Sequence, residues 1–424
     1  MINRVFLIAI FVNILLIGCS KKTNLDIDIE ELRKDGVTLL ESNTKSNLDY
    51  VEINKINRIS LNQISLNSSI NFSFDVIKNK NFFYHNLHNF YEKQIIHFDN
   101  KIAFVDDETN VFILDHDLKL INKFQVYKKN KYRNYLLKFS LINKENIIYI
   151  ADNLGRISAY DFIKNSLLWY NDFNVPFISN LVIYKSSIFV TNANGKLYSF
   201  NISNGMQNWS FETGTNIFKS YKAYQIALNN NILIFSNDLG LIYFINLDDQ
   251  KLLFNYTLEK DNRFINNDLF QITKFIIDKE YLYFSSNFGK IVKLNILTKS
   301  KLWTSNYSSN LNLIKIPDKL ISINEDGHLN IYDDIEGQIL FSKNLINILL
   351  KNGYKSKNVK FNNIFLSSDY IHASTNVGHI ISLNSNNFND IKINKISDKI
   401  ISNILVLKNG IFFIGDNNYI YKVI

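Results

Sequence analysis

Cysteine, proline and glycine are scarce in this chain of 424 residues, which has one cysteine, two prolines and 14 glycines. A single cysteine excludes an intrachain disulfide and a zinc site built from cysteines. With so few prolines and glycines, the turns must depend on asparagine and aspartate, which tolerate left-handed backbone. The chain has no Walker loop, GxSxG or HExxH motif, and its seven histidines do not cluster like metal ligands. These absences count against the common nucleotide-binding, nucleophilic and metal-dependent enzymes.

The one cysteine, Cys19, follows a segment that is typical of a secretory signal. Only Arg4 carries charge before an apolar run at 5–17. A basic start, a short apolar stretch and a small residue before a cleavage site describe a signal rather than a fold element. The run is interrupted by Asn13 and is shorter than the roughly 20 apolar residues that span a bilayer. We therefore predict that residues 1–18 are a cleaved signal peptide.

The residues around the cysteine, Leu16-Ile17-Gly18-Cys19, resemble the lipobox of bacterial lipoproteins. The resemblance implies diacylation of Cys19 and cleavage before it. Two acyl chains hold a protein stably on a membrane without a transmembrane helix. Ser20 follows the cysteine in place of an aspartate, which by resemblance to lipoprotein sorting implies the outer membrane. The alternative is an uncleaved anchor with an incidental cysteine.

The composition after the signal favours a large globular body. Hydrophobic residues make up 46% of the chain and aromatic residues 14%, so a sizeable core is expected. The net charge of +8 comes from scattered lysines, which is typical of a solvated basic surface rather than a nucleic-acid interface. Residues 19–67 are polar and weakly periodic, and we predict that they form a lipidated tether. Residues 68–424 form the body.

The body is built on one repeated unit. The unit is clearest at 192–209, where Gly195 is followed by alternating apolar residues, by Asn201 six residues later and by Trp209 fourteen residues later. The repeat glycines are Gly155, Gly195, Gly240, Gly289, Gly327 and Gly378, and six residues after them stand Asp161, Asn201, Asn246, Asn295, Asp333 and Asn384. Fourteen residues after the first five glycines stand Trp169, Trp209, Phe254, Trp303 and Phe341, whereas Gly378 is followed by Lys392 at that position. A constant offset across different local sequences predicts a repeat architecture.

The unit predicts a four-stranded antiparallel blade. Each repeat glycine lies between two short β-rich runs, which predicts a hairpin, and the second turn of the unit predicts another. A further apolar run, such as residues 180–184, supplies an inner strand. Four strands in roughly 44 residues is the period of a β-propeller blade. We expect the aromatic residue of each outer strand to pack between neighbouring blades.

Two further copies of the unit have another residue in the glycine position. Thr109 stands there in the first copy and Asn418 in the last. Asparagine adopts positive φ readily but threonine does not, so we expect the turn at Thr109 to have a different form. Phe124 closes the first copy after a turn one residue longer than the others. Together the copies predict an all-β, eight-bladed β-propeller.

The last copy stops at Ile424, before its outermost strand. A ring left in this way would expose an unpaired sheet edge. We predict that an N-terminal strand at Ile70–Val76 pairs beside Tyr419–Val423 and closes the propeller. Phe72 would then stand in the place of the missing aromatic residue.

The repeat Asn-x-Gly-x-Leu-Tyr-x-Phe-Asn…Gly-x-x-x-Trp resembles the repeat of the quinoprotein, or PQQ-like, propellers. Within that group, the lipobox, the length and the blade spacing between Gly240, Gly289 and Gly327 resemble the BamB family, and residues 81–88 look like the first inner strand of that family. The resemblance implies a non-catalytic scaffold subunit of the outer-membrane β-barrel assembly (BAM) machinery, without cofactor, metal or nucleic acid. The implied partner is the periplasmic POTRA region of the central barrel subunit BamA. Sheet edges suggest client outer-membrane proteins as further partners, through strand addition.

The resemblance places the partner-binding residues on two loops near the middle blades. The matching residues here are Ile217, Phe218, Lys219 and Tyr221 in one loop and Arg263, Asn266 and Asp268 in the other. Arginine and aromatic residues are common interface anchors. The chain departs from the family at Asn266, where the first of two spaced carboxylates is expected, and has an insertion around 344–360. The alternative is that both are ordinary exposed loops of a large propeller.

Two other functions share most of these features. A PQQ-dependent dehydrogenase resembles this chain in the repeat alone, and such enzymes are longer and commonly carry a vicinal cysteine pair, which is absent here. We expect His328 and His379, which each follow a repeat glycine, and His85 and His88 to be strand residues rather than metal ligands. A lipoprotein propeller with some other periplasmic partner would differ only in the two loops. Fold alone does not decide between these functions.

Overall fold

The structure is a computed structural model in which residues 76–80, 93–127, 136–215, 222–258 and 270–424 are described, apart from residues 289, 308, 310, 325, 355–358, 368, 397–398, 408 and 417–418. For residues 76–80 only the backbone is described. The chain divides into two units, Met1–Lys45 and Ser46–Ile424. All described residues belong to the second unit. The predicted signal, Cys19 and the tether lie outside the described residues.

Eight four-stranded antiparallel sheets follow one another along the described part of the chain. Blade 1 contains β2 (Ile96–Phe98), β3 (Lys101–Val105), β4 (Asn110–Asp115) and β5 (Leu120–Gln125), and blade 2 contains β6 (Phe139–Lys144), β7 (Ile147–Asp152), β8 (Arg156–Asp161) and β9 (Ser166–Asp172). Blade 3 contains β10 (Val182–Tyr184), β11 (Ser187–Thr191), β12 (Lys196–Asn201) and β13 (Gln207–Glu212), and blade 4 contains β14 (Ile226–Asn229), β15 (Ile232–Ser236), β16 (Leu241–Asn246) and β17 (Lys251–Thr257). Blade 5 contains β18 (Ile276–Asp278), β19 (Tyr281–Ser286), β20 (Lys290–Asn295) and β21 (Ser300–Ser305), and blade 6 contains β22 (Ile314–Ile316), β23 (Lys319–Ile323), β24 (His328–Asp333) and β25 (Ile339–Asn344). Blade 7 contains β26 (Phe361–Leu366), β27 (Tyr370–Thr375), β28 (His379–Asn384) and β29 (Ile391–Lys395), and blade 8 contains β30 (Leu405–Leu407), β31 (Gly410–Ile414), β32 (Tyr419–Val423) and the N-terminal β1 (Val76–Lys80).

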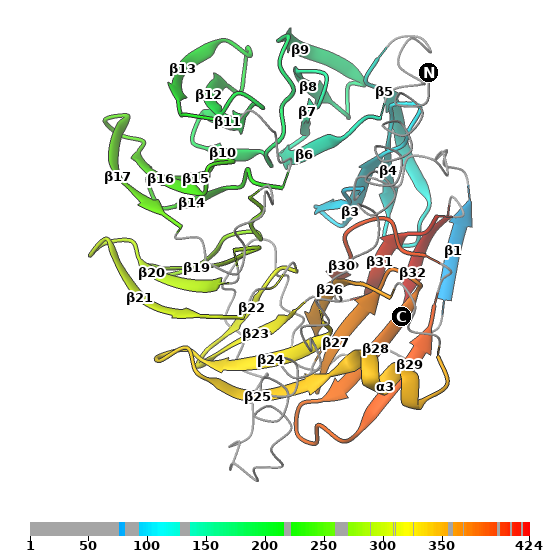
Figure 1. Ribbon diagram of the computed structural model, residues 1–424. Helices are drawn as coiled ribbons and strands as arrows, with labels where there is room; N and C mark the ends of the chain where they lie inside the picture. The colour runs from blue at the N-terminus through cyan, green and yellow to red at the C-terminus, as the bar shows by residue number, and fades with distance from the viewer. Residues whose placement is uncertain are drawn as a thin grey trace, which may run out of the picture. The chain divides into compact units, whose positions relative to one another are not determined.

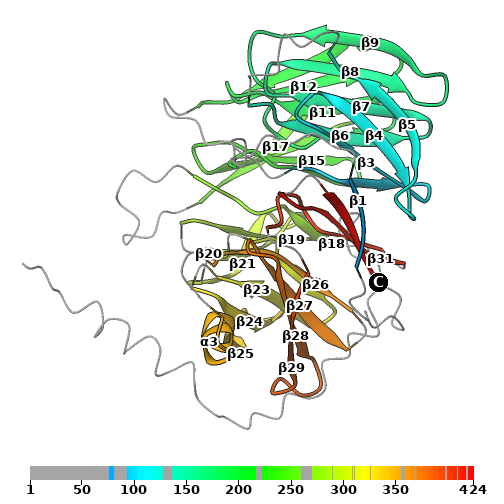
Figure 2. The ribbon, with the colours of Figure 1, turned by 90° about the vertical axis from the view of Figure 1, so that its right-hand side faces the viewer.

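The eight-bladed β-propeller predicted from the repeats is confirmed (Figure 1). In Figure 1 the blades follow the colour order around a ring, and the blue strand β1 lies beside the red strand β32. Figure 2 shows the same neighbours from the side.

The repeat glycine closes the turn between the second and third strands of a blade. In blade 2, Gly155 has a φ of +95° and its N–H donates to the carbonyl of Asp152. The Asp152 carboxylate accepts from the N–H groups of Leu154 and Arg156, which is an Asx turn. A Cβ at Gly155 would lie 2.1 Å from the carbonyl oxygen of Phe173, so a larger residue does not fit there.

The turn at Thr109 has the same form as the glycine turns, and the expectation of a different form was wrong. Thr109 has a φ of +68°, and its N–H donates to the carbonyl of Asp106. Oδ1 of Asp106 accepts from the N–H groups of Glu108 and Asn110, as Asp152 does in blade 2. The Asx cap and the buried surroundings therefore outweigh the poor intrinsic preference of threonine for left-handed backbone.

The asparagine or aspartate six residues after each glycine caps the second turn. Asp161 accepts from the N–H groups of Ile163 and Lys164, and Asn295 accepts from those of Leu297 and Thr298. The same cap is made by Asp115, Asn201, Asn246, Asp333 and Asn384. The constant offset seen in the sequence is thus the distance between two side-chain-capped turns at opposite ends of the third strand.

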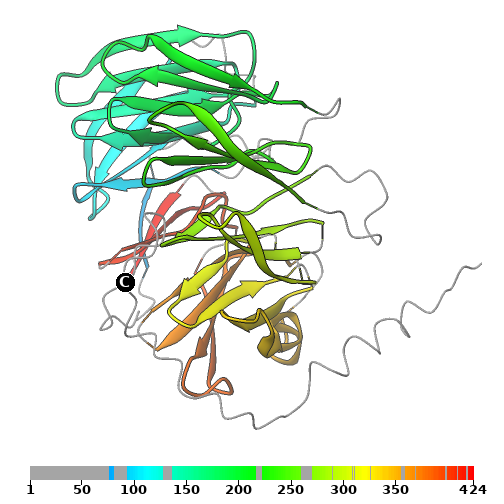
Figure 3. The same cartoon turned by 90° about the vertical axis from the view of Figure 1, so that its left-hand side faces the viewer.

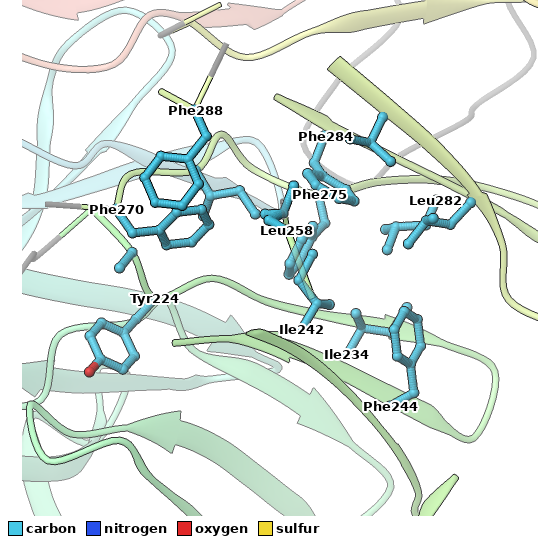
Figure 4. Packing of buried hydrophobic residues seen from close by; sticks show 14 of the residues in the cluster. Tyr224, Ile234, Ile242, Phe244, Leu258, Phe270, Phe275, Leu282, Phe284 and Phe288 are labelled. Atoms are coloured by element: carbon cyan, nitrogen blue, oxygen red, sulfur yellow. The ribbon is translucent and has the colours of Figure 1, made fainter. Parts of the chain in front are cut away.

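Each of the eight junctions between neighbouring blades contains a cluster of buried apolar side chains. Figure 4 shows the junction of blades 4 and 5, where Phe244 and Ile242 of blade 4 lie near Phe284 and Leu282 of blade 5. At the last junction, Phe412 of blade 8 packs in one cluster with Phe104 of blade 1. Burying one such side chain stabilises the fold by roughly 1.5–3 kcal/mol. The ring is therefore closed by the same packing that joins its other blades.

An N-terminal strand closes blade 8, as predicted, but the pairing segment is different. β1 pairs antiparallel with β32, with Val76 opposite Val423 and Lys80 opposite Tyr419. The expected strand at Ile70–Val76 therefore shares only Val76 with the observed one, and Phe72 lies outside the described residues. The blade needs any strand that can complete its hydrogen bonds, so the alternation of apolar residues did not determine the register.

Side-chain amides join the inner strands of neighbouring blades. Asn403 of blade 8 accepts from the N–H of Ile95 and donates to the carbonyl of the same residue, at 2.7 and 3.1 Å. Gln94 makes the same pair of bonds with Leu141 in blade 2, and Asn180 makes it with Ile226 in blade 4. The junction that closes the ring, between blades 8 and 1, thus uses the same pair of amide hydrogen bonds as two junctions between consecutive blades.

The insertion around 344–360 contains a short helix, α3 (Leu345–Lys351). Asn344 caps its N-terminus, and Leu345 and Leu349 are buried in the cluster between blades 6 and 7. Figure 3 shows α3 against the strands of blade 6. The insertion therefore adds to the core at this junction.

Candidate partner-binding surface

The seven predicted partner-binding residues lie outside the described residues. They are Ile217, Phe218, Lys219, Tyr221, Arg263, Asn266 and Asp268, in the connections between blades 3 and 4 and between blades 4 and 5. The structure does describe the residues at which these two connections begin and end. The positions of these end residues show whether the two connections leave the propeller close together or far apart.

The two connections are joined where they end. The N–H of Ile272, just after the second connection, donates to the carbonyl of Lys222, just after the first, at 3.1 Å. At the start of the second connection, the N–H of Leu258 donates to the carbonyl of Gly240 in blade 4. The described ends of both connections therefore meet at blade 4.

The base beneath these ends is apolar and tightly packed. Ala223, Tyr224, Leu258 and Phe270 are all buried in one cluster. The rings of Phe270 and Phe288 are 5.1 Å apart, and Figure 4 shows them packed together. Such packing leaves little freedom at the ends of the connections, so they are held in place by the core of blades 4 and 5.

One buried tyrosine in this base lies beside a carboxylate. Burial raises the pKa of the Tyr224 hydroxyl, and the charge of the neighbouring Asp238 raises it further. The tyrosine therefore stays protonated and neutral at physiological pH. Its proton is not available for acid–base chemistry in that range, which fits a structural role for this pair.

The turn between β15 and β16 of blade 4 places an apolar residue, Leu239, next to this buried cluster. The side chain of Asn237 donates to the carbonyl of Gly214, at 3.0 Å, and accepts from the N–H of Leu239. Leu239 is 43% exposed. A Cβ at Gly214 would lie 3.2 Å from its side chain, so Leu239 lies over the start of the first connection. Sequence reasoning missed Leu239, although an apolar residue at the tip of a polar turn was the available signal.

The described histidines have structural positions. His328 and His379 begin β24 and β28, as predicted for strand residues. His372 is buried, with its ring nitrogens 2.8 Å from the hydroxyls of Ser367 and Ser382, and burial lowers its pKa to about 3. His85 and His88 lie outside the described residues. Within the described ranges, no three histidine, cysteine or acidic side chains come together as a metal site would require.

Over the same residues, no helix has the length and apolar character needed to cross a membrane. The surface around Leu239 and Lys222 offers an exposed apolar side chain and the hydrogen-bonded ends of two connections. These features suit contact with another macromolecule.

The sheet order and the blade motif define the class of protein, which is an eight-bladed β-propeller with PQQ-like repeats. The family model described as outer membrane protein assembly factor BamB matches residues 141–343. The chain therefore carries a BamB-like β-propeller repeat domain, as the repeat motif predicted.

Two solved structures share the fold. The crystal structure of BamB from Moraxella catarrhalis is similar with a TM-score of 0.64 and 14% identity, over 77% of this chain and 95% of that chain. The computationally designed Ika8 protein is similar with a TM-score of 0.60 and 12% identity, over 79% of this chain and 96% of that chain. At these identities the likeness shows the fold alone. No curated protein sequence matches the chain.

Proposed function

We propose that this protein is a non-catalytic scaffold subunit of the outer-membrane β-barrel assembly machinery. It binds the periplasmic POTRA region of the central barrel subunit BamA and aids the insertion of outer-membrane proteins. The observation that carries the proposal is the hydrogen bond from Ile272 to Lys222, which joins the two connections that hold the predicted binding residues. The BamB-like repeats at 141–343 support the same role.

The proposed anchor is a lipid on Cys19, after cleavage of residues 1–18. Residues 19–67 then form a tether between the lipid and a propeller that begins at about residue 68. This places the protein at the periplasmic face of the outer membrane. A Cys19→Ser variant would be expected to lose incorporation of a palmitate analogue and to leave the membrane fraction. Incorporation by that variant would contradict the assignment of the anchor.

We expect a few side chains to contribute most of the binding free energy at the proposed interface. Phe218 and Arg263 are the strongest candidates, because aromatic and arginine side chains contribute most at protein interfaces. Ile217, Lys219, Tyr221, Asn266 and Asp268 complete the proposed set. Leu239 joins this set from the described surface, since it is exposed beside the start of the first connection.

An affinity pull-down from outer membranes tests the role and the site separately. The lipidated protein is the bait, and partners are identified by mass spectrometry. We expect recovery of the barrel-assembly subunit, lost in a Phe218→Ala/Arg263→Ala variant and retained in the control Ile335→Ala, which changes a residue 81% exposed on blade 6. Recovery with the double variant would contradict the site and leave the function. Recovery of no assembly subunit would contradict the function.

A further inference from the structure

The three tryptophans of the chain occupy one repeat position, and two of them are locked onto the next blade. Trp169 of blade 2 donates from Nε1 to the carbonyl of Ile202 in blade 3, at 2.9 Å. Its ring lies over Gly205, where a Cβ would be only 2.5 Å away. Trp303 of blade 5 makes the same contacts with the carbonyl of Asp334 and with Gly337 in blade 6.

Trp209 of blade 3 meets a different neighbour. The residue of blade 4 that corresponds to Gly205 and Gly337 is Gln250, which keeps the left-handed backbone with a φ of +59°. At the two locked junctions an added Cβ would lie 2.5 Å from the indole, so Gln250 has a side chain at a position where the other two turns have none. Within the described ranges, no hydrogen bond is made by Nε1 of Trp209 or by the amide of Gln250. Trp209 is only half-buried, and its ring lies 5.7 Å from that of Phe189.

A pocket of about 370 Å³ lies at this junction of blades 3 and 4. Its lining includes Tyr184, Phe189, Asn208, Trp209, Leu247 and Gln250. The volume lies in the range of roughly 300–1,000 Å³ in which small ligands are bound. Figure 1 shows the two blades side by side, with β13 and β17 as their outer strands. Among the three tryptophan junctions, the pocket thus lies at the one where the opposite turn has a glutamine in place of a glycine.

The charges at the rim neutralise each other. Lys185 of blade 3 lies 3.2 Å from Oδ1 of Asp248 in blade 4. Asp248 also accepts from the side chain of Asn231, at 2.6 Å. Because Lys185 lines the pocket and is paired with Asp248, the pair gives the rim no net charge, which suits a neutral ligand.

We propose that this pocket binds a neutral saccharide unit. A pyranose ring has an apolar C–H face and a rim of hydroxyl groups that both donate and accept. Here the half-buried indole of Trp209 supplies an apolar surface and an N–H donor, and the amide of Gln250 supplies donors and an acceptor. The Asn208 amide donates to the hydroxyl of Ser187, at 3.1 Å, and adds its carbonyl oxygen as an acceptor. Ser186 and Ser187 add hydroxyl groups to the lining. The inference does not depend on the proposed role in barrel assembly.

Ligand-observed saturation-transfer NMR tests the proposal with the full lipidated chain in a detergent that has no sugar headgroup. The probes are chitotriose, maltotriose and an unglycosylated tripeptide. We expect saturable binding of at least one trisaccharide. The affinity falls at least tenfold in Trp209→Ala and in Gln250→Gly, and it is unchanged in Ile335→Ala on blade 6. Gln250→Gly keeps a residue suited to the observed φ, so loss of binding in that variant does not arise from misfolding.

Three results would overturn the proposal. The first is no saturable binding of either trisaccharide by the unchanged protein. The second is binding that persists in both pocket variants, which places the saccharide elsewhere. The third is binding of the tripeptide, and of neither trisaccharide, at the same residues.

Discussion

The junction of blades 2 and 3 and the junction of blades 3 and 4 begin from the same residue type and end differently. Trp169 at the first is 9% exposed, docks on Gly205 and bonds to the carbonyl of Ile202. Trp209 at the second is half-buried and faces Gln250 across a pocket. The outer-strand tryptophan therefore does not determine the packing of its own junction. The residue opposite, in the turn of the next blade, decides whether the indole is locked or left accessible.

The largest expected effect is on the two tryptophans themselves. We expect Trp169→Ala to lower the free energy of unfolding by about 3–5 kcal/mol, because it leaves a cavity and removes the shorter of two hydrogen bonds to the Ile202 carbonyl, the other coming from Tyr149. Trp209→Ala, at the half-buried position, is expected to cost only about 1–2 kcal/mol. Urea unfolding followed by far-UV circular dichroism measures both. Equal losses would mean that the two junctions are packed alike, contrary to the comparison.

The next effect concerns the glycine under the locked indole. Gly205→Ala brings a Cβ to 2.5 Å from the ring of Trp169 at a φ of +75°, and we expect a loss of about 2–3 kcal/mol. Gly353→Ala is the matched control, since Gly353 has a φ of +79° and, among the described residues, no atom within 4 Å of an added Cβ. It should cost only about 1 kcal/mol. If both variants lose the same amount in urea unfolding, backbone strain rather than docking explains the glycine.

A smaller effect of opposite sign is expected when the second junction is converted into the first. Gln250→Gly removes a side chain from left-handed backbone and lets Trp209 dock, so we expect a gain of about 0.5–1 kcal/mol. The gain should shrink in a Trp209→Ala background, which a double-mutant cycle measures. An undiminished gain in that background would show that relief of backbone strain, rather than docking, is responsible.

The smallest effect is expected at the ion pair beside the pocket. Lys185 and Asp248 join blades 3 and 4 at 3.2 Å, but both side chains are more than half exposed. Exposed pairs are screened by solvent and contribute little. We expect Lys185→Met to leave the urea midpoint unchanged within experimental error. A clear fall in the midpoint would mean that the charge pair, rather than apolar packing, holds this junction.

The local features of the fold were predictable because they depend on short spacings. In each unit, the glycine and the asparagine or aspartate six residues later lie at the two ends of one strand. Gly155 and Asp161 could therefore be recognised from the sequence without knowing which blades lie beside them. The contacts between blades were not predictable in the same way. Trp169 and Gly205 are far apart in sequence, and the spacing of the unit alone does not say what stands opposite each tryptophan.

The incorrect and missed predictions also depend on contacts that residue preference and spacing do not include. Thr109 adopts positive φ because Asp106 caps its turn, an effect that residue preference alone does not include. The closing strand lies at Val76–Lys80 because tertiary pairing with β32 selects the register. Leu239 joined the candidate surface only when its position beside Gly214 was known. The roles of Phe218 and Arg263 stay predictions.

The central claim is that the propeller binds the barrel-assembly subunit through the surface where its two middle connections meet. Site-specific photo-crosslinking in cells tests it most directly, with a photoreactive residue placed at Leu239 or, as the control, at Ile335 on blade 6. We predict a crosslink to the POTRA region of the central barrel subunit from position 239 and none from position 335. A crosslink from position 335 alone, or from neither position, would contradict the account.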